Sequence, residues 1–133
     1  MKSDLKIKDA MTHVIHSVGV DQPISVAKEL LQKYQIRHLP VLDGGDIVGI
    51  VSERDLQFAK GWVESAETDL LIKDVLTADP YIVDPSQKLV DVAERMAEGR
   101  YGCAIIVDNG TLVGIFTTVD ACRTLASLLK NDR

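Results

Sequence analysis

Residues 48–55 have the sequence Val-Gly-Ile-Val-Ser-Glu-Arg-Asp, and residues 113–120 have the sequence Val-Gly-Ile-Phe-Thr-Thr-Val-Asp. The second stretch follows the first at an offset of 65 residues, and this offset aligns the rest of the two halves without a gap. Identical residues then meet at paired positions, among them Asp4 and Asp69, Lys8 and Lys73, Thr12 and Thr77, Val18 and Val83, and Gln22 and Gln87. Such a duplication predicts two similar lobes related by a pseudo-two-fold axis, so that a pocket in one lobe has a counterpart in the other.

The composition is that of an ordinary soluble globular domain, with 133 residues of which 46% are hydrophobic and 26% charged. The formal net charge of −5 argues against nucleic acid or an anionic membrane as a partner. No apolar run approaches the roughly 20 residues of a spanning helix, and no signal-peptide region follows Met1, so we expect a cytoplasmic protein. Cys103 and Cys122 form no CxxC pair, and we expect two reduced thiols.

In each half of the sequence, one amphipathic helix is predicted after a pair of residues typical of a helix N-terminus. Asp21 lies before Pro23, and Asp84 lies before Pro85, which is typical of an acidic cap followed by proline in the first turn. Apolar residues then recur at helical spacing. They are Ile24, Ala27, Leu30, Leu31 and Tyr34 in the first half, and Leu89, Val92, Ala93, Met96 and Ala97 in the second.

A β-hairpin is expected next in each half, because apolar runs flank Asp-Gly-Gly-Asp at residues 43–46 and Asp-Asn-Gly-Thr at residues 108–111. The strands are apolar throughout, which indicates cover on both faces. Gly49 and Gly114 lie in the second strands, where the lack of a side chain would let a ligand approach the backbone.

Each half is therefore predicted to be an α/β unit of strand, helix, strand, strand and helix, with a short first strand at residues 14–18 and at residues 81–83. The second helix is expected to begin near Asp55 in one half and near Asp120 in the other. Trp62 is expected to pack at a subunit contact or as an ordinary, partly buried aromatic residue. The predicted boundaries are residues 1–60 for the first repeat, 61–68 for the linker and 69–133 for the second repeat.

The turn from strand to second helix contains the residues best suited to ligand chemistry. Ser52 lies three residues before Asp55, and Thr117 lies three residues before Asp120. This spacing is that of a capping box, which needs no ligand. It also suits an anion site, because free amides and the positive dipole end at a helix N-terminus favour a phosphate. The hydroxyl can donate to phosphate, and the carboxylate can accept from both hydroxyls of a ribose.

Three stretches resemble the signature blocks of a CBS domain: Lys-Asp-Ala-Met-Thr at residues 8–12, Ile-Arg-His-Leu-Pro-Val-Leu-Asp at 36–43, and Gly-Ile-Val-Ser-Glu-Arg-Asp at 49–55. The second half contains weaker copies in the same order. The chain thus resembles a stand-alone CBS pair, also called a Bateman module. The resemblance implies a regulatory module that binds AMP, ADP, ATP, S-adenosylmethionine or a related nucleotide in the cleft between two CBS repeats and signals its occupancy to a partner.

The resemblance also implies roles for individual residues. Asp55 and Asp120 would bind the ribose. The residues that would contact phosphate are Ser52, Arg54, Thr117, Thr118, Arg37 and His38. Each site would borrow the first strand of the other repeat, and the residues near the adenine would be Thr12, His16, Ser17, Val18, Thr77, Tyr81, Ile82, Val83, Ile36 and Tyr101. Thr77 and residues 81–83 would serve the Asp55 site, and Thr12 and residues 16–18 the Asp120 site.

The two predicted sites are unequal in charge. The Asp55 site would offer a hydroxyl, a guanidinium and an imidazole, from Ser52, Arg54 and His38. The Asp120 site would offer Thr117, Thr118 and Arg37, with Cys103 at the position of His38 and Val119 at that of Arg54. We therefore expect phosphorylated ligands to prefer the Asp55 site.

Two pairs of residues suggest other chemistry. His13 and His16 have the spacing of a metal pair, but three residues along a strand place side chains on opposite faces, so no metal is expected. His38 and Cys103 occupy equivalent positions of the repeats and could meet as a Cys-His pair. Since no orienting third group is evident, we expect no catalysis there.

The expected function is that of a non-enzymatic regulator with an adenine nucleotide, AMP or ATP first, as its ligand and no other cofactor. The expected partners are a second copy of the chain, joined through apolar helix faces, and an unknown protein effector. The alternative is a structural homodimerisation module whose Ser-x-x-Asp and Thr-x-x-Asp boxes only cap helices. An enzyme is the third interpretation, and it lacks a nucleophile, a base and an orienting group at suitable spacing.

Overall fold

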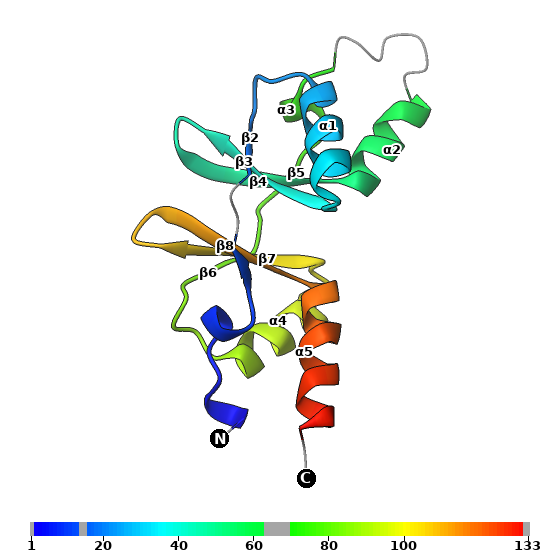
Figure 1. The fold of residues 1–133 in the computed structure, drawn as a ribbon. Coiled ribbons are helices and arrows are strands. Elements are labelled where there is room, and N and C mark those ends of the chain that lie inside the picture. The colour runs from blue at the N-terminus through cyan, green and yellow to red at the C-terminus, as the bar shows by residue number, and fades with distance from the viewer. Residues whose placement is uncertain (1, 14–15, 63–69, 132–133) are drawn as a thin grey trace. The chain divides into compact units, whose positions relative to one another are not determined.

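The first fifteen residues fold with the second half of the sequence, not with the first. The computed structural model describes residues 2–13, 16–62 and 70–131 (Figure 1). Within it, His16–Pro80 form one compact unit, which we name the Asp55 unit after its motif aspartate. The other unit combines Met1–Ile15 with Tyr81–Arg133, and we name it the Asp120 unit.

The Asp55 unit has helices packed against a four-stranded sheet (Figure 1). Its elements are β2 (Val18–Gly19), α1 (Ile24–Tyr34), β3 (His38–Asp43), β4 (Asp46–Ser52), α2 (Glu53–Trp62), α3 (Ile72–Val75) and β5 (Thr77–Ala78). The strand order is β2-β3-β4-β5, with β2 parallel to β3 and the other neighbours antiparallel. Its core joins buried residues of α1, α2 and α3 to those of the sheet, among them Ile24, Ala27, Leu31, Leu56, Ile72, Leu39, Val41 and Val51.

The Asp120 unit repeats this arrangement with the strand order β1-β8-β7-β6. Its elements are the 3-10 turns η1 (Lys2–Asp4) and η2 (Ile7–Asp9), then β1 (Thr12–His13), β6 (Ile82–Val83), α4 (Leu89–Gly99), β7 (Cys103–Asp108), β8 (Thr111–Thr117) and α5 (Thr118–Lys130). Its core contains Ile7, Val83, Val92, Met96, Ala104, Ile106 and Phe116. Each such side chain contributes about 1.5–3 kcal/mol when fully buried, so these clusters are what fix the helices on the sheets. Among the described residues, no helix is both long enough and apolar enough to cross a bilayer.

Both predicted hairpins are confirmed. Gly44 and Gly45 connect β3 to β4 with φ of +60° and +91°, and Asn109 and Gly110 connect β7 to β8 with φ of +50° and +78°. Positive φ at both residues of a two-residue loop is what a type I′ turn requires, and Asn and Gly tolerate it. Consecutive residues of β7 are buried, which agrees with strands covered on both faces.

The predicted helices form, but the proposed caps are wrong. Helix α1 follows Pro23, and no side-chain cap reaches it from Asp21. Helix α4 begins at Leu89, and Asp84 instead forms a turn in which its Oδ1 accepts from the backbone N of Ser86 at 2.7 Å. The hydrogen bonds from Ser86 also lower the pKa of Asp84. Both helices are therefore positioned by their buried apolar faces, since neither has a capping side chain.

Short strands from opposite halves of the sequence are exchanged between the sheets. β1 pairs with β8 in the register Thr12 to Ile115, and β5 pairs with β4 in the register Thr77 to Ile50. The predicted ligand approach at Gly49 is wrong, because a Cβ there would lie 2.6 Å from the carbonyl oxygen of Thr77. The same holds for Gly114, which faces Met11 and the carbonyl oxygen of Thr12. The two glycines make room for the exchanged strands.

Other boundaries differ from expectation. The first strands are shorter than predicted, with β2 limited to Val18–Gly19 and β6 to Ile82–Val83, and residues 14–15 lie outside the described residues. Helix α2 continues through Trp62, two residues into the predicted linker, whose remainder lies outside the described residues. The side chain of Trp62 is also outside them, so its predicted packing stays a prediction.

Candidate functional site

Each second helix begins with a capping box built by the motif residues. In the Asp55 unit, the backbone N of Ser52 donates to Asp55 Oδ2 at 2.9 Å, and the backbone N of Asp55 donates to Ser52 Oγ at 3.1 Å. In the Asp120 unit, the backbone N of Thr117 donates to Asp120 Oδ2 at 2.9 Å, and the backbone N of Asp120 donates to Thr117 Oγ1 at 3.2 Å. The capping interpretation is thus confirmed, and it leaves the outer lone pairs of each carboxylate for other donors.

A threonine of the exchanged strand supplies one such donor in each unit. Thr12 Oγ1 donates to Asp120 Oδ1 at 2.8 Å. Thr77 Oγ1 lies 3.3 Å from Asp55 Oδ1 and 3.4 Å from Oδ2, so its single proton is shared over two long contacts. The structure therefore brings each motif aspartate together with the threonine predicted for its site.

Arg123 is a contact of Asp120 that the sequence analysis missed. Its Nη1 lies 3.0 Å from Asp120 Oδ1, one turn along α5. The carboxylate side chain is 6% exposed, whereas that of Arg123 is 70% exposed, so the guanidinium approaches from the solvent side. An acidic residue followed by arginine at i+3 on a helix is the signal that could have identified the pair. In the Asp55 unit the equivalent position is Phe58.

A pocket of about 590 Å³ borders the motif of the Asp55 unit. Arg54 and Asp55 line it together, with apolar side chains of α2 and α3 around them. The full lining is Arg54, Asp55, Phe58, Ala59, Leu70, Asp74, Val75 and Leu76. Among the described residues, Arg54 has no hydrogen-bond or ion-pair partner. Its guanidinium and the half-buried carboxylate of Asp55 therefore remain available to a ligand in a pocket whose volume suits a small molecule.

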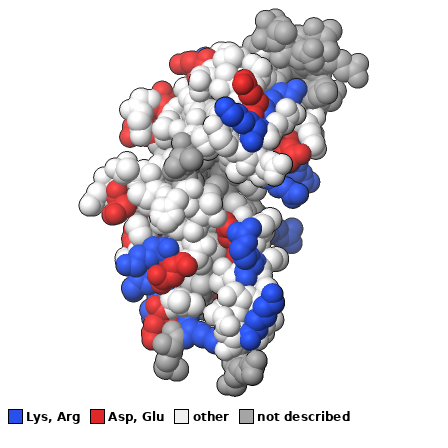
Figure 2. Space-filling view, in the orientation of Figure 1, with Lys and Arg blue, Asp and Glu red and all other residues white. Residues whose placement is uncertain are grey.

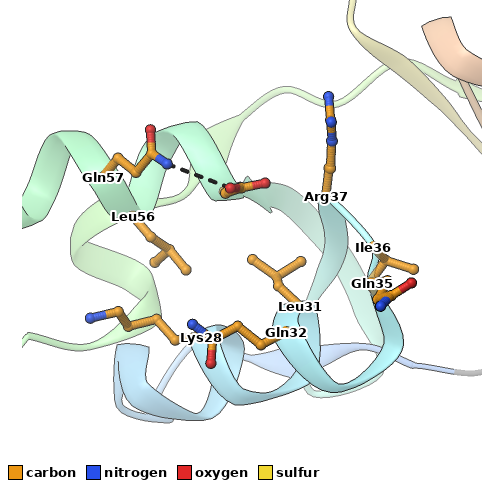
Figure 3. A pocket seen from close by; sticks show the side chains of 9 residues that line it. Lys28, Leu31, Gln32, Gln35, Ile36, Arg37, Leu56 and Gln57 are labelled. Atoms are coloured by element: carbon orange, nitrogen blue, oxygen red, sulfur yellow. Dashed lines mark hydrogen bonds between the residues drawn. The ribbon is translucent and has the colours of Figure 1, made fainter.

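A second pocket, of about 430 Å³, lies between α1 and α2 of the same unit (Figure 3). Its floor is formed by Leu31 and Leu56, and its rim includes Gln57, whose Nε2 donates to Glu53 Oε1 at 3.5 Å. Ile36 and Arg37 lie at its edge. Ile36 and Arg37, both predicted as ligand contacts, therefore line a different pocket from Arg54 and Asp55.

Cys103, which the sequence leaves open as a partner of His38, is not a reactive thiol. Burial raises the pKa of Cys103 to about 12, so the sulfur is a neutral thiol at physiological pH. Burial also lowers the pKa of His38, with Asp55 acting in the opposite direction and Arg37 adding to the decrease. His38 is therefore a neutral imidazole whose electrostatic neighbours include the motif carboxylate of its own unit.

An aromatic residue that precedes β2 in the Asp55 unit, and its equivalent before β6 in the Asp120 unit, each stack on a second ring. His16 stacks on Tyr34 with ring centroids 3.8 Å apart, and Tyr81 stacks on Tyr101 with centroids 5.1 Å apart. His16 Nε2 is buried without a hydrogen-bond partner among the described residues. Gly99 is the equivalent of Tyr34, and the stacking ring of the second unit comes from Tyr101, two positions further along the chain. This ring fills the space at Gly99, where a Cβ would collide with it.

The structure shows the positions of several other residues predicted to contact the nucleotide, but not whether they do so. Ser17 and Val18 lie with His16 in the Asp55 unit, and Ile82 and Val83 lie with Tyr81 in the Asp120 unit. Their service to the opposite motif stays a prediction, as does a phosphate role for Thr118, the exposed first residue of α5.

The described residues offer no metal centre, because they contain no group of three or more His, Cys, Asp or Glu side chains arranged to bind an ion. His13 belongs to one unit and His16 to the other. On the face drawn in Figure 2, acidic and basic side chains are interspersed, and no broad basic patch of the kind that binds nucleic acid is seen.

The family model of the CBS domain matches this chain twice, at residues 7–60 and 72–127. The chain belongs to the CBS domain family. Both matches end within the helix that carries the motif aspartate, so each contains one complete capping box. The chain is therefore a CBS pair, and the α/β architecture of two repeats predicted from the sequence is confirmed.

Solved CBS proteins resemble the chain over nearly its whole length. A candidate acetoin utilization protein (AcuB) from Vibrio cholerae aligns with a TM-score of 0.84 and 31% identity, covering 96% of each chain. CBSX2, solved in complex with AMP, aligns with a TM-score of 0.76 and 26% identity, covering 93% of this chain and 98% of that one.

A longer relative shows the CBS pair as part of an enzyme. The inosine-5'-monophosphate dehydrogenase of Thermoplasma acidophilum is 35% identical over 107 residues, which are 80% of this chain and 21% of the enzyme. The chain spans about a fifth to a quarter of the dehydrogenases that it matches, so the similarity concerns their CBS region.

Proposed function

We propose that the CBS pair is a non-enzymatic regulatory module that binds an adenosine-containing nucleotide at its motif aspartates and reports the occupancy to a partner protein. The observation that carries the proposal is the pairing of Arg54 and Asp55 in one pocket of about 590 Å³. A ribose diol donates two hydrogen bonds to a carboxylate, and a phosphate accepts from a guanidinium, so this pair suits the two polar parts of a nucleotide. CBSX2 with its bound AMP supports the same ligand class.

Asp55 has the acceptor capacity that ribose binding needs. Among the described residues, its carboxylate accepts from the backbone N of Ser52 and from the shared proton of Thr77. A carboxylate has about four acceptor positions, so about two are left for a diol. Ser52 and His38 are the further candidates for the phosphate side, and AMP or ATP are the first ligands to test.

A role without catalysis agrees with the chemistry of the described residues. The buried Cys103 is protonated, and its pKa of about 12 removes the thiolate that a cysteine nucleophile needs. A ligand that binds one conformation or assembly state more tightly shifts the equilibrium toward that state, which a partner protein can recognise.

A thermal-shift panel of AMP, ADP, ATP, NAD and S-adenosylmethionine tests the proposal. A ligand at a hundred times its Kd adds about 2.7 kcal/mol to the free energy of unfolding, which gives a clear rise in Tm. Asp55→Ala is expected to remove most of that rise. The matched control is Asp46→Thr, which removes an exposed carboxylate of the same unit and installs the residue found at the equivalent Thr111. A panel without any shift contradicts the proposal.

Exposed apolar side chains on the second helices favour a second candidate function, a homodimerisation module. Phe58 on α2 is 67% exposed, and Leu125 and Leu129 on α5 are 58% and 64% exposed. Helix faces of this kind commonly pack against a second copy. Sedimentation at tens of micromolar tests it. A stable dimer that shows no thermal shift with any nucleotide favours the structural role, and a nucleotide-dependent dimer favours the regulatory one.

A further inference from the structure

The motif carboxylates of the two units differ in how fully their oxygens are hydrogen bonded. Asp120 Oδ1 accepts from Thr12 Oγ1 at 2.8 Å and from Arg123 Nη1 at 3.0 Å. Asp120 Oδ2 accepts from the backbone N of Thr117 at 2.9 Å and lies 3.1 Å from its Oγ1. These contacts fill the roughly four acceptor positions of a carboxylate, so a ribose diol can bind Asp120 only by displacing a donor.

Arg123 is the donor that can leave. The backbone N of Thr117 is part of the helix cap, and Thr12 is fixed in β1 by its pairing with β8. The Arg123 side chain is 70% exposed and can rotate into water, where a guanidinium is well solvated. The Arg123 guanidinium can therefore leave the Asp120 carboxylate and return to it without a change in the fold.

The equivalent position in the Asp55 unit has different chemistry. Phe58 stands where Arg123 stands, and a phenyl ring carries no donor for a carboxylate. Asp55 and Phe58 line the same pocket, in which the ring offers an apolar surface beside the carboxylate. The residue at the third position after the aspartate thus distinguishes an open motif from a covered one.

We propose that Arg123 is an internal competitor for the Asp120 carboxylate and sets the order in which the two motifs take a nucleotide. Asp55 is the open site that binds the ribose first, and Asp120 becomes available only when Arg123 turns away. The inference rests on the proposed function, because it concerns the ribose of the same ligand class. It makes Arg123 and Phe58 specificity-determining residues of the pair.

Calorimetry with AMP tests the inference on variants that isolate each motif. Asp55→Ala leaves only the covered motif, and adding Arg123→Ala to it is expected to tighten the remaining AMP affinity at least tenfold, the scale of one hydrogen bond to a charged group. Lys130→Ala in the Asp55→Ala background is the matched control. It removes a positive charge from the same helix and should leave the affinity unchanged.

The reciprocal variant keeps the test decisive if the loss of Arg123 unfolds the Asp120 unit. Phe58→Arg places a guanidinium one turn after Asp55 at a position that is 67% exposed, so the core is untouched. It is expected to weaken AMP binding to the parent chain at least tenfold. Circular dichroism checks that each variant is folded.

Two results overturn the inference while leaving the proposed function intact. In one, AMP binds the parent but Phe58→Arg leaves the affinity unchanged. In the other, Arg123→Ala in the Asp55→Ala background fails to tighten AMP binding or weakens it, which would make Arg123 a ligand contact. A parent chain that binds no AMP at millimolar concentration overturns the proposed function and this inference together.

Discussion

Thr12 donates a hydrogen bond to Asp120 at 2.8 Å although 108 positions separate the two residues in the sequence. The strand that carries Thr12 belongs to the first sequence repeat, and the aspartate belongs to the second. Thr77 and Asp55 form the reverse exchange over longer distances. Each motif carboxylate is thus bonded to a strand from the opposite repeat.

We predict that Thr12→Val lowers the free energy of unfolding by about 1–3 kcal/mol, because valine keeps the shape but leaves the buried Asp120 oxygen without its shortest side-chain donor. Urea denaturation measures the loss. Thr77→Val is the matched control and should cost less, since its contacts are 3.3 and 3.4 Å long and Asp55 is less buried than Asp120. Equal losses for the two variants would contradict the prediction.

We predict that Gly49→Ala destabilises the chain by about 1–3 kcal/mol, in the range of overpacking in a close-packed core. The new Cβ would meet the backbone oxygen of Thr77 at 2.6 Å, and a backbone atom cannot move aside cheaply. Gly114→Ala should cost less, because its nearest neighbour is the flexible side chain of Met11.

Gly19→Ala is the control for that series, since its Cβ would make only ordinary contacts at 3.7 Å and beyond. Thermal or urea unfolding should rank the three variants in the order Gly49, Gly114, Gly19, from most to least destabilised. A Gly49→Ala variant as stable as Gly19→Ala would mean that β5 does not pack closely on β4.

We predict that one thiol of the native chain reacts with iodoacetamide at pH 8 and that both react in urea. Cys122 is exposed, whereas Cys103 is buried and its pKa is raised to about 12. An unfolded cysteine ionises near pH 8.5, so between that pH and about 12 the unfolded chain releases a proton that the native chain retains. Stability should therefore fall as the pH rises above about 8.5, and Cys103→Ala should reduce that slope.

The duplication explains why so much of the fold was predictable from the sequence. The helix over residues 24–34 and the hairpin turns at Gly44 and Asn109 depend on neighbouring residues only, and the structure confirms both predictions. The exchanged strands have two residues each and no periodicity. Their pairing is set by tertiary contacts, which is why Gly49 was mistaken for a point of ligand approach.

The candidate site was predictable in its motif and not in its environment. The spacing of Ser52 and Asp55 is enough to predict the capping box, which forms. The i+3 spacing of Asp120 and Arg123 permits their ion pair, but that the pair covers the motif carboxylate is seen only in the packed structure. The stack of Tyr101 on Tyr81 needs the space left at Gly99, a compensation that appears only when side chains are packed.

We predict that Arg54→Ala weakens AMP binding by one to two decades and leaves adenosine binding nearly unchanged. The guanidinium lines the pocket with Asp55 and has no partner among the described residues, so it is available to a phosphate. A hydrogen bond to a charged group is worth about 1.5–3 kcal/mol, which corresponds to that range of affinity. Adenosine has the ribose but no phosphate, and its affinity should depend on Asp55 and not on Arg54.

Calorimetry with both ligands on the parent, Arg54→Ala and Asp55→Ala separates the two contacts. Arg95→Ala is the matched control, because it removes an exposed arginine of the other unit that lies 5.6 Å above the Tyr101 ring. It should change neither affinity at the Asp55 motif. If Arg54→Ala weakens AMP and adenosine equally, the arginine supports the pocket wall rather than the phosphate. The preference of phosphorylated ligands for the Asp55 motif would then need another source, with the neutral His38 beside that motif as the next residue to replace.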